Sequence, residues 1–183
     1  MNYIAFNKPY GVLCQFTGES GDKTLADFGL PKGVYAAGRL DKDSEGLLIL
    51  TDDGLFNQKL TNPKSNKEKT YYVQVENIPT NEDIEVLCKG VLIKGGYQTL
   101  PCFARLIDDP GFEQRDPPIR ERKSIPTCWL EIRLVEGKNR QVRSMTASIG
   151  YPTLRLVRVS VGKLNIDKLK PGLWVKVKKE DIL

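Results

Sequence analysis

Residues 34–50 read VYAAGRLDKDSEGLLIL, in which a polar loop between two glycines separates two strand-like segments. Residues 34–37 have the composition of a strand, and residues 47–50 are continuously apolar, which is typical of a buried strand. The loop of residues 38–46 carries several carboxylates, with Asp41 near its start. Catalytic and ligand-binding groups commonly sit on loops that rigid strands support. The segment therefore predicts a buried strand next to a candidate functional loop.

Similar short elements are predicted on both sides of this segment. Strands are expected at residues 3–6, 12–16, 69–75, 127–134, 154–161 and 173–178. Short helices are expected at residues 24–28, 55–60, 80–89 and 139–149. A capping box formed by Thr80 and Asp83 opens the third helix, and Gly90 closes it. Alternating strands joined by a few short helices indicate an α+β fold, with a mainly antiparallel mixed sheet flanked by short helices.

The chain has 183 residues, enough for one domain that buries a sizeable core. A polar segment at residues 62–68 is the best linker, so we expect a single domain with two halves at approximately 1–64 and 65–183. Residues 108–124 predict an extended loop, and so long a loop in a compact domain is commonly functional. The N-terminus lacks the pattern of a signal peptide, and no stretch approaches about 20 apolar residues. These features predict a soluble, cytoplasmic protein with no membrane segment.

Composition narrows the chemistry and suggests a partner. Histidine is absent, which excludes His-based triads, most catalytic zinc sites and imidazole acid–base chemistry. The four cysteines include no C-x-x-C pair, so the sequence predicts neither a metal site nor a disulfide framework. The net charge is +5, and basic residues gather in the second half: Arg115, Arg120, Arg122, Lys123, Arg133, Lys138, Arg140, Arg143, Arg155 and Arg158. Because arginine suits phosphate contacts, a polyanionic partner is expected, with simple solubility as the alternative.

Three interpretations of the Asp41 loop compete. The first is a calcium loop, because carboxylates recur from Asp41 to Asp52 at the spacing of an EF-hand. The flanks argue against it, since an EF-hand has an amphipathic helix on each side, whereas residues 34–37 and 47–50 predict strands. The second interpretation is a solvated acidic turn without chemistry, and the third is a catalytic aspartate. The third requires supporting residues elsewhere in the chain.

Two other segments supply such residues. Alternation in the strand at residues 69–75 places Lys69 and Tyr71 on one face. In the last predicted helix, Arg140 and Arg143 share a face next to an apolar stripe. That stripe is formed by Val142, Met145 and Ile149. Taken singly, a half-buried tyrosine and two solvated surface arginines are the simpler interpretations.

Four ordered segments together resemble a known family. They are Asn7-Lys8-Pro9-x-Gly11, Gly38-Arg39-Leu40-Asp41 with Ser44-x-Gly46-Leu47-Leu48, Lys69-x-Tyr71, and EGKNRQVR at residues 136–143. These segments resemble the motifs of the pseudouridine synthases of the RsuA branch. Residues 33–39 and 117–127 also resemble a narrower group, the ribosomal large subunit pseudouridine synthases E. The chain departs from the branch in beginning without an N-terminal S4 module, and in carrying Ser144 where the motif has a second arginine.

The resemblance implies the pseudouridine synthase fold with a central RNA-binding cleft. It also implies a bacterial enzyme that isomerises uridine to pseudouridine in large-subunit (23S) ribosomal RNA. Asp41 matches the catalytic carboxylate, as nucleophile or as base at the sugar. Arg143 matches the cation that keeps this carboxylate ionised, and Tyr71 matches the aromatic residue that stacks on the target base and assists proton transfer. Because the reaction is redox-neutral and uses no external group, no cofactor is expected.

Other residues match positions around the base and along the RNA. Val142 would form the floor of the pocket that receives the base, and Lys69 belongs to the same pocket. Arg39 would fill the space that the flipped base leaves in the stacked RNA. Contacts to the RNA backbone are expected from Lys138, Arg140, Arg120, Arg122 and Lys123. The protein is expected to act on ribosomal RNA as a monomer. The target uridine, and the choice between free RNA and an assembling ribosome, remain open.

The alternative is a non-catalytic RNA-binding or ribosome-assembly protein that keeps this fold. The basic second half fits that alternative equally well. That alternative does not explain why Asp41, Tyr71 and Arg143 occur together. Their joint presence favours the enzyme.

Overall fold

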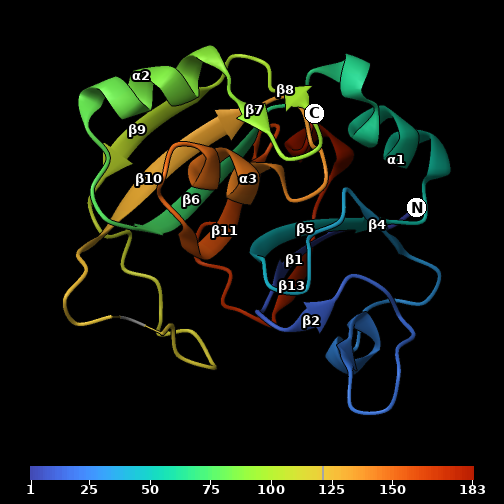
Figure 1. The fold of residues 1–183 in the computed structure, drawn as a ribbon. Coiled ribbons are helices and arrows are strands. Elements are labelled where there is room, and N and C mark those ends of the chain that lie inside the picture. Colours follow the sequence, from blue (N-terminus) through green and yellow to red (C-terminus); the bar gives the residue numbers. More distant parts are fainter. Residues whose placement is uncertain (121) are drawn as a thin grey trace. The chain divides into compact units, whose positions relative to one another are not determined.

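The computed structural model describes residues 1–120 and 122–183 (Figure 1). Glu121, which belongs to the 117–127 segment, lies outside the described residues. The chain forms two compact units, one of residues 1–67 with 157–183 and the other of residues 68–156. The division near residue 67 lies close to the expected linker. The last residues return to the first unit because their strand β13 (Trp174–Lys176) pairs with β1 (Tyr3–Lys8).

Strand β5 (Glu45–Thr51) is the centre of the first unit. All seven of its residues are buried, which confirms the buried strand predicted at residues 47–50. It pairs antiparallel with β1 and with β4 (Tyr35–Ala37), and parallel with the 157–158 part of β11 (Thr153–Val161). β13 extends the sheet beyond β1, and β12 (Leu164–Asn165) pairs with β11. A continuous apolar strand with partners on both edges explains this complete burial.

Short elements complete the first unit. They are β2 (Val12–Leu13), β3 (Lys23–Thr24), α1 (Gly54–Thr61), and the 3-10 turns Leu25–Phe28, Pro63–Ser65 and Lys179–Asp181. Helix α1 begins at Asp53, whose carboxylate accepts from the backbone N–H of Phe56 at 2.9 Å. One core cluster of this unit contains Ile4, Phe6, Leu25, Leu48 and Leu50. The predicted strand at residues 12–16 is shorter than expected and ends at Leu13.

The second unit contains a sheet of order β6-β10-β9, paired antiparallel throughout. Its strands are β6 (Lys69–Glu76), β10 (Thr127–Leu134) and β9 (Phe103–Ile107). The register places Ile132 of β10 opposite Tyr71 of β6 and Ala104 of β9. A separate two-stranded hairpin is formed by β7 (Leu92–Ile93) and β8 (Tyr97–Gln98). The strand predicted at residues 127–134 is confirmed without a change of bounds.

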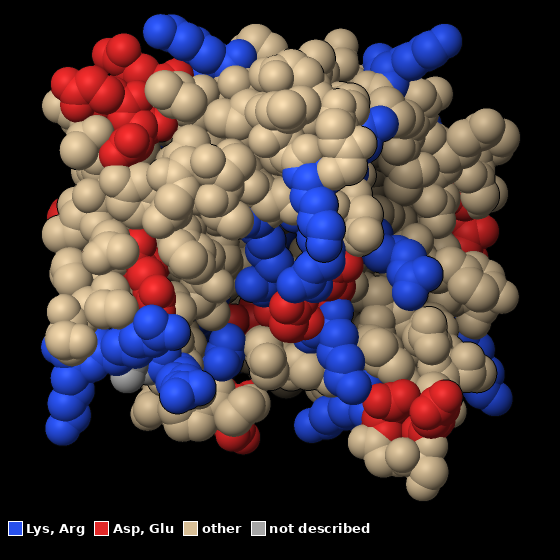
Figure 2. Space-filling model, in the orientation of Figure 1, with Lys and Arg blue, Asp and Glu red and all other residues tan. Residues whose placement is uncertain are grey.

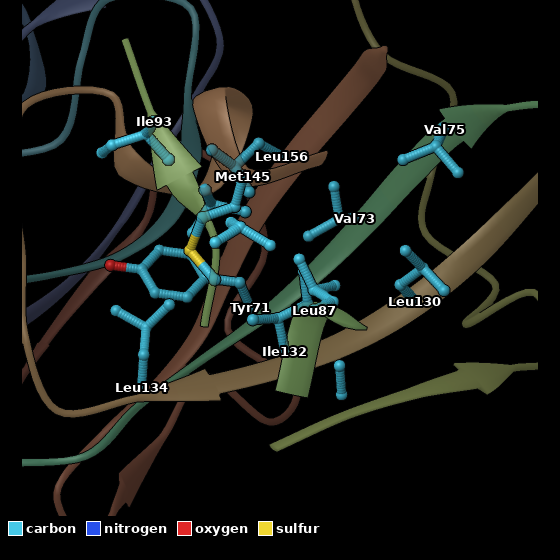
Figure 3. Close-up of a cluster of buried hydrophobic side chains, with 13 residues drawn as sticks. Tyr71, Val73, Val75, Leu87, Ile93, Leu130, Ile132, Leu134, Met145 and Leu156 are labelled. Atoms are coloured by element: carbon cyan, nitrogen blue, oxygen red, sulfur yellow. The ribbon is translucent and has the colours of Figure 1, made fainter. Parts of the chain in front are cut away.

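Helices α2 (Asn81–Lys89) and α3 (Gln141–Ser148) pack their apolar residues into the core of the second unit. Side chains of β6 and β10 that point to one face of the sheet meet Leu87 of α2 and Met145 of α3 (Figure 3). The predicted capping box of Thr80 and Asp83 opens α2, and Gly90 ends it at a φ of +93°. A side chain at Gly90 would place its Cβ 2.3 Å from the carbonyl oxygen of Thr99, so only glycine fits there.

The observed architecture is the α+β fold that the sequence predicts, with mainly antiparallel pairing and short helices. Helix α3 begins two residues later than expected, because Arg140 adopts a left-handed conformation with a φ of +50°. Residues 108–126 form no helix or strand where they are described, which agrees with the predicted extended loop. Among the described residues, no helix has the length and apolar character needed to cross a bilayer.

Candidate active site

Asp41 lies on the loop between β4 and β5 in the first unit. Its backbone carbonyl accepts from the N–H of Ser44 at 3.1 Å, which closes a tight turn. Leu40 is buried, and its N–H donates to the Sγ of Cys14 at 3.3 Å. Arg39 points outward and contacts Oε1 of Gln15 at 3.5 Å. The turn therefore has one buried anchor, a half-buried Asp41 and an exposed Arg39.

Two buried cations, Lys8 and Arg158, donate hydrogen bonds to backbone carbonyls of this loop and of its ends. Lys8 is completely buried, and its Nζ donates to the carbonyl oxygens of Val12 at 2.8 Å, Pro9 at 2.9 Å and Lys42 at 3.4 Å. The N–H of Gly11 also donates to the Lys42 carbonyl, at 2.8 Å. Burial lowers the pKa of Lys8 to about 8, against the opposing attraction of Cys14 and nearby carboxylates. The loop is thus held directly beside Asp41.

The second buried cation, Arg158, holds the two ends of the loop. Its Nε donates to the carbonyl oxygen of Leu47 at 2.9 Å, and its Nη2 donates to the carbonyl oxygen of Gly38 at 2.8 Å. Gly46 pairs with Arg158 in the sheet, with a φ of +106°. A Cβ at Gly46 would lie 2.3 Å from the backbone oxygen of Arg158. The glycine at this end of the loop therefore permits the close approach of two backbones.

Lys8 and Arg158 are the functional residues that sequence reasoning missed. The opening motif assigns no role to Lys8, and the sequence places Arg158 among the basic residues of the second half that suit phosphate contacts. The structure corrects the second assignment, since Arg158 is buried and bonded to backbone carbonyls. The signal was available in the pattern, because Arg158 lies between Val157 and Val159 in an apolar strand. A buried charge in such a strand needs partners, and here the loop supplies them.

The calcium-loop interpretation is wrong. The loop is flanked by the strands β4 and β5 rather than by two helices. The Asp52 carboxylate accepts from the backbone N–H of Asn2 at 2.6 Å and from its side-chain amide at 2.8 Å. Within residues 1–120 and 122–183, no cluster of Cys, Asp and Glu is arranged to hold a metal ion.

Tyr71 lies on β6 in the second unit, with its ring in the core cluster that also contains Val142, Leu134 and Met145. In Figure 3 its hydroxyl lies at the end of the cluster where Ile93 and Leu134 also lie. Tyr71 is buried, and its ring is held in place by packing. Lys69, two residues earlier on the same strand, is half-buried.

Glu136 organises the start of α3, where the predicted arginines lie. Its Oε1 accepts from the N–H of Leu100 at 2.8 Å and from Nε2 of Gln141 at 2.6 Å. Its Oε2 accepts from the hydroxyl of Tyr97 at 2.5 Å. Oε1 of Gln141 then accepts from the N–H of Lys138 at 2.9 Å. This buried carboxylate ties the hairpin and the loop before α3 together, and it fixes the first turn of the helix.

The first turn of α3 presents Val142 and Arg143. Val142 and Met145 are buried in the core cluster and Ile149 packs against it, so the predicted apolar stripe is confirmed. Arg143 is half-buried, on the turn that Glu136 fixes. The structure thus brings Tyr71 and Val142 into one cluster, with Arg143 next in sequence. Asp41 and Arg39 belong to the other unit.

The residues expected to contact the RNA backbone are exposed. Lys138 places its Nζ 4.7 Å from the ring centre of Tyr97, and Arg140 is exposed at the start of α3. Arg120, Arg122 and Lys123 are exposed in the segment between β9 and β10, with Nε of Arg122 lying 3.8 Å from Oε1 of Glu76. Figure 2 shows Lys and Arg side chains gathered over this segment, at the lower left of the view.

Comparisons with known proteins show which family this chain belongs to. The family model described as RNA pseudouridylate synthase matches residues 2–148. Ribosomal large subunit pseudouridine synthase E of Vibrio vulnificus is 56% identical over 174 residues, which are 95% of this chain and 74% of that protein. The protein of the same name from Xanthomonas campestris pv. campestris is 53% identical over 173 residues, 93% of this chain and 92% of that protein.

A solved structure supports the same assignment. The crystal structure of a pseudouridylate synthase matches this fold with a TM-score of 0.82 and 27% identity, covering 99% of this chain and 72% of that one. The family model extends over most of the chain, including the segments that carry Asp41, Tyr71 and Arg143. The chain therefore belongs to the RNA pseudouridylate synthase family.

Proposed function

We propose that this RNA pseudouridine synthase converts a specific uridine of large-subunit (23S) ribosomal RNA into pseudouridine in the bacterial cytoplasm. The observation that carries the proposal is the 53–56% identity, over more than nine-tenths of this chain, to relatives named ribosomal large subunit pseudouridine synthase E. Relatives named for the small subunit are more distant, at 30% identity for the protein of Haemophilus influenzae. The large subunit is therefore the better supported substrate.

The reaction defines what the site must provide. The bond between C1′ and N1 of uridine breaks, the base turns, and a bond forms between C1′ and C5. A proton leaves C5 and a proton is gained at N1, so atoms and electrons balance within the nucleotide. The chemistry needs neither an oxidant nor a group donor, which supports a cofactor-free enzyme. We expect this enzyme to act as a monomer. One ionised carboxylate at the sugar is sufficient to assist it, as nucleophile or as base.

We assign this carboxylate to Asp41. The anchoring of its loop by Lys8 and Arg158 supports the assignment, because a catalytic group must be held within a fraction of an ångström of its productive position. Arg143 would keep the carboxylate ionised when RNA excludes water, since a desolvated carboxylate otherwise tends to become neutral. Its place on a turn fixed by Glu136 supports that role.

Tyr71 and Val142 would receive the base. The ring of Tyr71 is held in the core, so it would provide a rigid stacking surface, and its hydroxyl would assist proton transfer at C5. Val142 would exclude water that could capture the detached sugar, and Lys69 would border the same pocket. Flipping the base out of folded RNA costs a few kcal/mol, and Arg39 would fill the space that the base leaves.

The exposed basic residues would position the RNA without reading its sequence. Lys138, Arg140, Arg120, Arg122 and Lys123 are all exposed, as phosphate contacts require. Their contribution should weaken as salt increases, because each neutralised phosphate releases counterions.

Tritium release tests the proposed function. 23S RNA carrying tritium at C5 of its uridines would be incubated with the protein, both free and as partly assembled large subunits, with 16S RNA as the matched control. The proposal predicts release of one tritium per 23S molecule from at least one of these substrates, and none from 16S RNA. Absence of release from both 23S substrates, or equal release from 16S RNA, would contradict it.

A further inference from the structure

The sheet of the second unit has a second face, opposite the core cluster, that the catalytic residues do not use. Because side chains alternate along a strand, Tyr71 and Val73 point into the core while Tyr72 points to the other side. The register aligns Tyr72, Glu131 and Arg105 in one row, and aligns Thr70, Arg133 and Phe103 in the next. We call this side the outer face: Tyr72, Trp129, Glu131, Arg133, Phe103 and Arg105.

One part of the outer face is covered by the chain itself. The ring of Phe112, from the loop after β9, lies 5.6 Å from the ring of Trp129 and 6.1 Å from that of Tyr72. Arg155 holds Phe112 in place, with its guanidinium 5.5 Å from the ring and its Nη1 donating to the carbonyl oxygen of Glu113 at 3.0 Å. Trp129 is consequently buried. The loop therefore closes this part of the face to ligands.

The other part is open and combines an aromatic ring with two guanidinium groups. Phe103 is 44% exposed, which is high for so large an apolar side chain on a strand. The guanidinium of Arg133 lies 4.6 Å from the ring centre, and that of Arg105 lies 6.0 Å from it. Their side chains are 38% and 59% exposed. We call Phe103, Arg105 and Arg133 the open patch.

A buried carboxylate holds both arginines in place. Oε1 of Glu131 accepts from Nε and Nη2 of Arg133, each at 2.6 Å, and Oε2 accepts from Nε and Nη2 of Arg105, each at 2.7 Å. Each guanidinium thus lies in a fixed orientation, with further donors left to face outward. Glu131 offsets only one of the two cations, and the exposed Glu68 lies near enough to help raise the pKa of Arg133.

A planar ring beside two oriented guanidiniums is the surface on which an unpaired nucleobase stacks and a phosphate is bound. We propose that the open patch binds an unpaired nucleotide of the substrate RNA. This inference rests on the proposed function, and it adds a second RNA contact away from the catalytic residues. The charge argues for RNA rather than for an apolar protein surface, since an apolar partner would leave both guanidiniums desolvated.

The patch lies on the same strands as Tyr71 but on the other face of the sheet. Phe103 and Arg133 share a row with Thr70, the residue before Tyr71. Because side chains alternate along a strand, the patch would take a nucleotide that does not enter the pocket of Tyr71.

The experiment compares two RNAs and four proteins. One RNA is a hairpin that contains the uridine on which the enzyme acts. The other RNA is the same hairpin with its natural unpaired flanking nucleotides. Phe103→Leu keeps an apolar side chain and removes the flat ring, and Phe103→Tyr restores a ring. Leu106→Ala is the matched control, because Leu106 lies on the same strand and is similarly exposed, at 40%, but shares its row with the core residue Leu130.

The expected result is that Phe103→Leu weakens binding of the flanked RNA by about 5-fold or more, the loss expected for one stacked base. Binding of the bare hairpin, and binding by Phe103→Tyr and Leu106→Ala, should match the unmodified protein. Equal affinity of Phe103→Leu for the flanked RNA overturns the inference. So does an equal loss on both RNAs. Tritium release by the unmodified protein tests the proposed function separately, so failure of one is distinguishable from failure of the other.

Discussion

Replacing Gly46 by alanine tests how the Asp41 loop is joined to the sheet. Gly46 has a φ of +106°, a conformation that side chains rarely adopt, and such strain costs about 1–3 kcal/mol. An added Cβ would lie 2.3, 2.7 and 2.9 Å from the backbone O, N and C of Arg158. Because backbone cannot swing aside as a flexible side chain does, overpacking adds about 1–3 kcal/mol. The sum is a loss of about 2–6 kcal/mol, a large share of a typical stability of about 5–15 kcal/mol.

The assay is urea denaturation, followed by calorimetry of the variant and of a matched control. Gly54→Ala makes the same substitution at the first residue of α1, where a Cβ would meet nothing within 4 Å. Alanine is the better helix former there by up to about 1 kcal/mol, so the control should be neutral or slightly stabilised. In a chain of this size, Gly46→Ala should lower Tm by roughly 5 to 20 °C. A loss below about 1 kcal/mol, or equal behaviour of the two variants, would refute the reasoning.

The remaining predictions concern the groups that hold the site. Burial lowers the pKa of Lys8 to about 8 in the folded protein. Above that pH the Lys8 side chain is therefore protonated in the unfolded chain but largely neutral in the folded protein. The stability of the unmodified protein relative to Lys8→Met should therefore rise between about pH 8 and 10.5, by at most about 3 kcal/mol. Urea titrations of both proteins at several pH values measure this. A stability difference between the two proteins that does not change with pH would contradict the burial of a charged Lys8. Glu136→Gln should lower the free energy of unfolding by about 1–3 kcal/mol and speed amide hydrogen exchange at the start of α3. Tyr97→Phe removes a single hydrogen bond to Glu136 and should have a smaller effect. Unchanged exchange in Glu136→Gln would contradict the role of Glu136 in holding the first turn of α3. Arg143→Ala should lower turnover strongly, and a normal rate in the folded variant would count against its pairing with the carboxylate.

Local patterns predicted the elements well. Residues 47–50 are apolar without interruption, and their burial in β5 follows directly. Thr80 and Asp83 form the capping box of α2 because that signal depends only on residues within one helical turn. In α3 the stripe of Val142 and Met145 follows from the 3.6-residue period alone. The candidate loop and the core tyrosine were predictable for the same reason.

The rest depended on partners far apart in the sequence. Nothing local says that Arg158 donates to Gly38 and Leu47 or that Lys8 donates to Lys42, because these bonds form only once β5 and β11 pair. The same holds for the outer face, whose composition depends on the register of three strands. The return of residues 157–183 to the first unit was equally hidden, since strand pairing and not chain order decides it.

Single-turnover tritium release by Asp41→Asn tests the central claim most directly. Asparagine keeps the shape of the side chain and removes its charge, so the loop and the bonds of Lys8 and Arg158 to its backbone remain. We predict that release from 23S RNA is abolished, at least about 100-fold below the unmodified protein, with RNA affinity and urea stability nearly unchanged. Release at a rate close to that of the unmodified protein would contradict the assignment of Asp41 as the catalytic carboxylate.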